Sequence, residues 1–185
     1  TPNPIVQTPL NYCKGDIATP LVVVSSPGTT LRWYTAATGG TPTTATPAVL
    51  TTTVGTKTYY VTQFNATTNV ESTPRTAIVV NTLAAPAVAL GTITSNTAGT
   101  TAGSFLAATT EIGLYVGTTT EVTYRVPAST EAGVTGYAWT VPLGTTIISN
   151  PANTNVLTVN FQNVPSGAEA YGTIGVQAAN EAGCL

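Results

Sequence analysis

Apolar and polar side chains alternate in short runs along most of this chain, the pattern of strands that bury one face. In the run LRWYT, residues 31–35, Trp33 shares its face with Leu31. A second run, YAWTV, residues 137–141, repeats the pattern around Trp139. These are the two tryptophans of the chain, one in each half. One large ring on a central strand of each half is typical of two β-sandwiches.

The other alternating runs are short, lie roughly 8–12 residues apart and are separated by turns rich in Gly and Pro, which is the all-β pattern. No stretch of the sequence has a sustained i, i+3, i+4 apolar pattern that is not interrupted by Gly, Pro or runs of Thr, so we predict no helix. The clearest expected strands cover residues 21–24, 57–63, 76–80, 122–126, 146–148, 157–161 and 174–178.

Two local details of these elements can be read from the residues. Ser26–Pro27–Gly28 has the composition of a type II turn with Gly at a positive φ, and we expect it to join strand 21–24 to the Trp33 strand as a hairpin. In strand 76–80, the inward residues are either Ile78 with Val80 or, one register over, Val79. The pattern does not decide between these two registers.

We therefore predict an all-β chain of two sandwich domains in series, residues 1–82 and 83–185. The boundary lies in the short stretch Thr82–Pro86, where proline limits bending. A strand of about seven residues is about 23 Å long at ~3.3 Å per residue, and we expect two such domains in series to span on the order of 70 Å. The predicted core residues are Trp33, Tyr59, Val61, Tyr137, Trp139, Leu157, Val159 and Phe161.

Composition argues for a chain exposed outside the cell. Only 6% of residues are charged while 42% are hydrophobic, and Thr makes up about a fifth of the chain. Thr suits the solvent face of a strand without adding charge. The sequence does not start with Met and shows no signal peptide, so we expect a monomeric internal fragment of a longer secreted or surface protein.

The charge pattern removes two classes of partner. The net charge is −2 and the five cationic side chains are scattered, so the electrostatic basis for binding nucleic acid is missing. No run approaches 18 apolar residues, so we expect no membrane insertion.

The residues needed for catalysis are also scarce. There is no His, and the seven acids are spread along the sequence with none within two residues of another. We therefore predict no enzyme, no cofactor and no metal site. The candidate ligand contacts are Tyr34 and Tyr60, which lie on the strand faces opposite Trp33 and Tyr59 and could form an exposed pair that stacks on a glycan.

The two cysteines, Cys13 and Cys184, lie near opposite ends of the chain. In two domains set in series they would be tens of ångströms apart, whereas a disulfide needs Cα atoms within about 7 Å. We therefore predict that both are unpaired.

Several stretches resemble the Ig-like repeat of Bacteroidota surface proteins over about residues 8–82. They are Asn11–Cys13, Ile17–Pro20, Leu31–Pro42, Lys57–Gln63 and Glu71–Arg75. The second half is similar to the PKD-like repeat that accompanies it, through Tyr137–Pro142 with Gly144, Thr158–Phe161 and Ile174–Asn180.

The resemblance also bears on the cysteines. In the Ig-like family a Cys commonly precedes the Glu–Ser pair and bonds to the Cys of the Tyr–Cys pair, but Val70 occupies that place here. This implies that Cys13 has lost its usual partner. PKD-like repeats often carry paired cysteines, so Cys184 could bridge to a following repeat.

The resemblance implies a function as an extracellular structural repeat, a rigid spacer within a long adhesin of the gliding-motility type. Its partners would be neighbouring repeats of the same chain. The alternative is a carbohydrate-binding accessory module of a secreted polysaccharide-degrading enzyme, which would contact surface polysaccharide through Tyr34, Tyr60 or loop residues 38–44.

Overall fold

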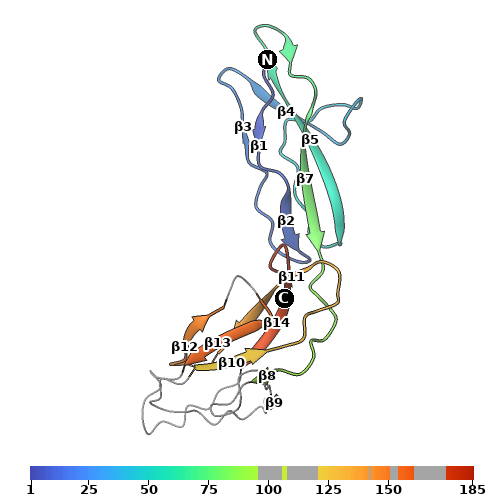
Figure 1. The fold of residues 1–185 in the computed structure, drawn as a ribbon. Helices are drawn as coiled ribbons and strands as arrows, with labels where there is room; N and C mark the ends of the chain where they lie inside the picture. Colours follow the sequence, from blue (N-terminus) through green and yellow to red (C-terminus); the bar gives the residue numbers. More distant parts are fainter. Residues whose placement is uncertain (96–105, 108–120, 142, 151–153, 161–173) are drawn as a thin grey trace. The chain divides into compact units, whose positions relative to one another are not determined.

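All regular elements in the described part of the chain are β-strands, which confirms the all-β prediction (Figure 1). The structure is a computed structural model, and it describes residues 1–95, 106–107, 121–141, 143–150, 154–160 and 174–185. These residues form two compact units. The first domain is Thr1–Ala84 with Cys184, and the second is Ala85–Gly183 with Leu185. The division falls after Ala84 because the last strand of the first domain continues through Leu83.

The first domain is a sandwich of two sheets. Strands β1 and β3 form one sheet, and the other has the order β2–β7–β5–β4 with β6 paired to β5. Neighbouring strands are antiparallel except β2 and β7, which run parallel (Figure 1). The bounds are β1 Ile5–Val6, β2 Leu10–Cys13, β3 Val23–Val24, β4 Thr30–Tyr34, β5 Gly55–Asn65, β6 Val70–Glu71 and β7 Thr76–Leu83.

Trp33 lies at the centre of the first domain's core. It is 2% exposed and pairs across β4 and β5 with Val61, which is fully buried. Tyr59, one step along the same face of β5, pairs with Ile78 of β7. Apolar side chains from both sheets close around these residues: Leu21 and Val80, with Val6, Leu10, Tyr12, Val23, Leu31 and Val49 partly buried. The three predicted core residues of this half are therefore confirmed.

The structure also decides the register of strand 76–80 and tests the expected turn at residues 26–28. Ile78 and Val80 are the buried residues of β7, so the first of the two registers is the one adopted. Gly28 has the predicted positive φ, 76°. The hairpin prediction is wrong, however, because β3 pairs with β1 whereas β4 pairs with β5. The turn therefore connects the two sheets instead of two neighbours in one sheet.

The second domain has the same two-sheet construction in its described residues. One sheet has the order β12–β13–β10–β8–β9, and β11 pairs with β14 in the other. The bounds are β8 Thr94–Ser95, β9 Leu106–Ala107, β10 Glu121–Arg125, β11 Val134–Thr140, β12 Thr146–Ser149, β13 Val156–Asn160 and β14 Gly175–Asn180.

The core of the second domain is centred on β10 and β13. Leu157 and Val159 are fully buried and pack with Val122 and Tyr124, which confirms the first two as core residues. Trp139 is only partly buried against this cluster, and its indole N–H donates to the Thr154 carbonyl oxygen at 2.9 Å.

The other two predicted core residues of this half have different outcomes. Tyr137 is half-buried, and its hydroxyl accepts a hydrogen bond from the Ser129 amide at 2.6 Å. Phe161 lies outside the described residues.

The prediction that Cys13 and Cys184 are unpaired is wrong. They form a disulfide with a Cα–Cα distance of 5.5 Å. Cys13 lies near the start of the sequence and Cys184 near its end, which led to the expectation that they are far apart. In the structure β2 is parallel to β7, so Cys13 pairs with Leu83, where the chain leaves that domain. Cys184 belongs to the first domain, and its sulfur lies 4.0 Å from the Leu83 carbonyl oxygen.

Candidate functional site

The densest polar cluster of the first domain lies on the face of the larger sheet opposite Trp33. Alternation along β4 places Arg32 and Tyr34 on this face, and Thr62 of β5 and Glu71 of β6 join them. The Glu71 carboxylate accepts from Arg32 Nη1 at 2.8 Å, from Thr62 Oγ1 at 2.6 Å and from the Tyr34 hydroxyl. The Arg32 contact is also an ion pair. The three hydrogen bonds to the Glu71 carboxylate connect β4, β5 and β6 within the sheet, and we call this cluster the Glu71 brace.

Three cationic side chains of this domain lie over aromatic rings. The Arg75 guanidinium is 3.3 Å from the Tyr34 ring centroid, and its Nη1 donates to the Ala36 carbonyl oxygen at 2.6 Å. The Arg32 guanidinium is 3.5 Å from the Phe64 centroid. The Lys57 ammonium is 5.0 Å from the Tyr59 centroid. These cation–π contacts stabilise the rings and take up charges that a ligand would otherwise meet.

The cluster shifts the titration of its two acidic members. Burial alone would raise the pKa of Glu71, but the hydrogen bonds from Thr62, Tyr34 and Arg32 together with the Arg32 charge lower it. For Tyr34, burial, the hydrogen bond to Glu71 and the Glu71 charge raise the pKa of the phenol. At neutral pH the pair is therefore a phenol donating to a carboxylate, which is a structural contact with no proton to transfer.

Replacing Glu71 by Gln tests this brace. Because the folded state lowers the Glu71 pKa, its contribution is complete above the ordinary glutamate pKa and is lost as the pH falls through the lower folded value. We expect the Glu71→Gln domain to be about 1 kcal/mol less stable than wild type at pH 7. The difference should shrink towards pH 3 in urea unfolding series. Glu121→Gln, at an exposed position of the second domain, is the matched control, and an equal effect of the two substitutions would contradict the brace.

Tyr34 and Tyr60, the candidate glycan contacts, are cross-strand partners in β4 and β5 and share a face. Tyr34 is only 7% exposed, because Arg75 covers its ring and Glu71 binds its hydroxyl. The expectation of an exposed aromatic pair is therefore wrong for Tyr34. Tyr60 is half-buried, and glycan contact through it stays a prediction.

Sequence reasoning missed Gln63, a buried amide that holds three segments of the first domain together. Its Oε1 accepts from the Ser26 amide and from Thr29 Oγ1, and its Nε2 donates to the Pro2 carbonyl oxygen at 3.0 Å. The residue is 1% exposed. Alternation along β5 places Gln63 on the inward face with Tyr59 and Val61, and only the buried Thr62 departs from the pattern. The period could therefore have indicated a buried Gln63, but its partners at Pro2, Ser26 and Thr29 were visible only in the fold.

A hollow of about 190 Å³ lies beside the Trp33 ring. Thr41 and Thr43 of the loop after β4, Lys57 and Tyr59 contribute to its wall. The Trp33 indole N–H is buried and has no hydrogen-bond partner among the described residues. Among the residues that the structure describes, the lining of this hollow includes one cation, Lys57, and several hydroxyls but no carboxylate.

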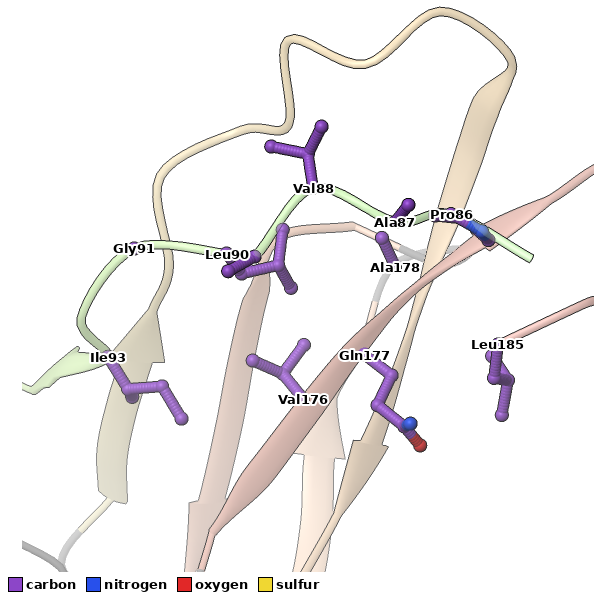
Figure 2. Close-up of a pocket in the computed structure, with 11 residues that line it drawn as sticks. Pro86, Ala87, Val88, Leu90, Gly91, Ile93, Val176, Gln177, Ala178 and Leu185 are labelled. Carbon is purple, nitrogen blue, oxygen red and sulfur yellow. The ribbon is translucent and has the colours of Figure 1, made fainter. Parts of the chain in front are cut away.

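A second hollow, of about 330 Å³, lies in the second domain between the segment 86–93 and β14 (Figure 2). Leu90, Ile93 and Val176 supply much of its apolar lining, and among the described lining residues Gln177 is the only one with a polar side chain. These described residues include no acid, base or nucleophile. Ligand sites usually combine an apolar wall with a few converging polar groups, which this hollow lacks.

The start of the second domain is held by Glu131. Its carboxylate accepts from the Ala87 amide at 3.0 and 3.1 Å and from the Val88 amide at 2.8 Å. These two backbone bonds lower the pKa of Glu131. The Glu131 carboxylate therefore fixes the backbone at residues 87 and 88.

Within the described ranges, no three His, Cys, Asp or Glu side chains lie close enough to hold a metal ion. No helix in those ranges has the length and apolarity needed to cross a bilayer.

Comparison with family models agrees with the two-sandwich structure. Residues 2–83 match the CHU_C-associated Ig-like domain, and residues 110–185 match the PKD-like domain. The chain is an Ig-like domain followed by a PKD-like domain. The resemblance inferred from the sequence is thus confirmed for both halves. In this Ig-like domain the predicted loss of the usual cysteine partner is accompanied by a different one, Cys184.

Comparisons with individual proteins add little to this assignment. A search of curated proteins gave no match. Among solved structures, the Ig-like–PKD-like pair is similar to the D00-D0 domain of Intimin, with 14% identity and a TM-score of 0.31. That match covers 99% of this chain and 95% of the Intimin chain.

Proposed function

We propose that this Ig-like–PKD-like pair is a structural spacer within a long secreted or cell-surface adhesin, and that it is not an enzyme. The proposal rests on the hydrogen bonds of three polar side chains. Glu71, Glu131 and Gln63 each bind two or more donors or acceptors of their own domain. Such groups stabilise a fold and leave little polar chemistry available for a substrate.

The disulfide supports a location outside the cytosol. Disulfides persist in oxidising compartments and are rare where thiols are kept reduced. The Cys13–Cys184 bond is therefore consistent with a secreted or surface-exposed protein. The low content of charged residues, 6%, agrees with a spacer that depends on packing and covalent bonding for its stability.

The finer assignment rests on the resemblance to Bacteroidota surface repeats. It favours an adhesin of the gliding-motility type, in which neighbouring repeats of the same chain are the partners of this pair. The chain itself would be monomeric and would bind neither nucleic acid nor a membrane.

Affinity electrophoresis of the 185-residue chain tests the spacer proposal. We expect its mobility to be the same in gels with and without embedded plant or algal polysaccharides, because a spacer has no glycan site. An unrelated Ig-like domain of similar charge is the reference for non-specific retardation. Retardation by one polysaccharide, beyond that of the reference, would contradict the proposal.

The second candidate function is a carbohydrate-binding accessory module of a secreted polysaccharide-degrading enzyme. The hollow beside Trp33 favours this function, because Thr41 and Thr43 of the loop 38–44 line it. In addition, the buried Trp33 indole N–H has no hydrogen-bond partner among the described residues. If a polysaccharide retards the chain, two substitutions locate the site. Thr43→Val weakens the retardation if the glycan binds in the hollow beside Trp33. Tyr60→Ala weakens it if the glycan binds on the outer face of the sheet.

A further inference from the structure

The disulfide changes the covalent path along which tension crosses this chain. Cys13 and Cys184 are 171 positions apart in sequence, and their bond closes nearly the whole chain into a ring. We propose that tension applied at residues 1 and 185 passes from Cys13 to Cys184 through the disulfide and bypasses residues 14–183. Residues 14–183, which include the whole second domain up to Gly183 and all of the first domain after β2, are then protected from mechanical extension.

The proposal depends on covalent connectivity. A pull at the two ends follows the shortest covalent path, which consists of residues 1–13, the two sulfur atoms and residues 184–185. All the strands from β3 to β14 lie inside the ring. Only β1 and β2 lie on the path under tension, and β2 is paired with β7 up to the cross-linked residue itself, Cys13 with Leu83.

The difference in extension between the two redox states is large. The fifteen residues of this path, joined by a disulfide with a Cα–Cα distance of 5.5 Å, reach at most about 50 Å when fully extended, at roughly 3.3–3.6 Å per residue. With the bond broken, all 185 residues can be extended, to about 600 Å. The bond therefore reduces the available extension more than tenfold.

The strands that remain under tension are held by contacts within the first domain. The amide of Lys14, directly after the cross-link, donates to the Leu83 carbonyl oxygen at 2.9 Å. Ile5 and Val6 of β1 pair with Val24 and Val23 of β3. Peeling β1 and β2 from their partners is thus the only extension that this path allows. The protection would be lost wherever thiols are reduced, so it suits an oxidising location.

This inference deepens the proposed spacer function but does not require it. Single-molecule stretching of the full chain, with peptide tags fused beyond residues 1 and 185, tests it. Without reductant we expect an extension of no more than about 50 Å before the tether becomes taut. After reduction in the same chamber we expect unfolding steps that total about 600 Å. Glycan binding in the electrophoresis experiment would overturn the spacer and leave this result unaffected.

Two further proteins serve as controls in the stretching experiment. Cys13→Ser/Cys184→Ser should give the long extension with and without reductant, and circular dichroism should first establish that it is folded. In a second tether, one tag is moved between Gly39 and Gly40 of an exposed loop, inside the ring. The shortest path from residue 1 then follows the backbone, so we expect about 140 Å in both redox states. Steps totalling about 600 Å from the oxidised, end-tagged chain would overturn the proposal.

Discussion

Trp33→Ala is expected to destabilise the first domain by about 3–5 kcal/mol, the range for removing a fully buried large aromatic side chain. The ring is 2% exposed and is enclosed by Leu21, Val61 and Val80, so its removal leaves a cavity that the two sheets cannot close without moving. Urea unfolding followed by far-UV circular dichroism measures the loss. The transition of the second domain should stay unchanged, because its core is separate.

Two substitutions in the same domain serve as controls for Trp33→Ala. Trp33→Phe should cost much less, because the ring keeps most of its volume and the indole N–H it removes has no hydrogen-bond partner among the described residues. Ile17→Ala should change stability by no more than about 0.5 kcal/mol, because Ile17 is 97% exposed. If Trp33→Ala and Ile17→Ala had similar effects, the tryptophan-centred core would be contradicted.

Cys184→Ala is expected to lower the stability of the first domain by about 3–5 kcal/mol, because it opens a ring whose closure restricts the unfolded chain. The residue is also buried, at 4% exposed, so the loss includes a small packing contribution. Chemical unfolding at pH 7 measures the effect. Cys13→Ala should give a similar loss, and the double substitution should cost no more than the larger of the two single ones, because all three remove the same bond.

Reduced wild type separates the cross-link from the side chains. It keeps both cysteine side chains and lacks only the sulfur–sulfur bond, so its stability should lie close to that of the double substitution. If reduction left the unfolding midpoint of the wild type unchanged, the disulfide would contribute nothing to stability. The ring-closure argument would then be contradicted.

Alternation was sufficient to place the strands that run through the sandwich cores. Val61 and Val159, predicted from period-two patterns, are fully buried in the structure. The pattern works there because one face of each strand contacts the core and the other contacts solvent. It was less informative for Trp139, which is only partly buried although it has the same sequence pattern as Trp33.

The features that sequence reasoning missed depend on how strands are paired. The turn at Gly28 was correctly placed, but the residues could not show that β3 and β4 belong to different sheets. The cysteine pairing failed for a related reason. The parallel β2–β7 pair brings Cys13 beside Leu83, and no local pattern distinguishes a parallel partner from an antiparallel one.

The candidate site was the least predictable part of the chain. Alternation placed Tyr34 and Tyr60 on the strand faces opposite Trp33 and Tyr59, and the register makes the two tyrosines cross-strand partners. The burial of Tyr34 could not be predicted, because Arg75, which covers its ring, lies 41 positions further along the sequence. The brace on Glu71 likewise joins three different strands.

Peptide mapping without reduction tests the central claim, that the two ends of this Ig-like–PKD-like pair are covalently joined. Trypsin cuts after Lys14 and after Arg125, which separates residues 1–14 from residues 126–185. Mass spectrometry of the unreduced, alkylated monomer should find these two peptides as one disulfide-linked species that separates on reduction. Two separate peptides, each with an alkylated cysteine before any reduction, would contradict the account.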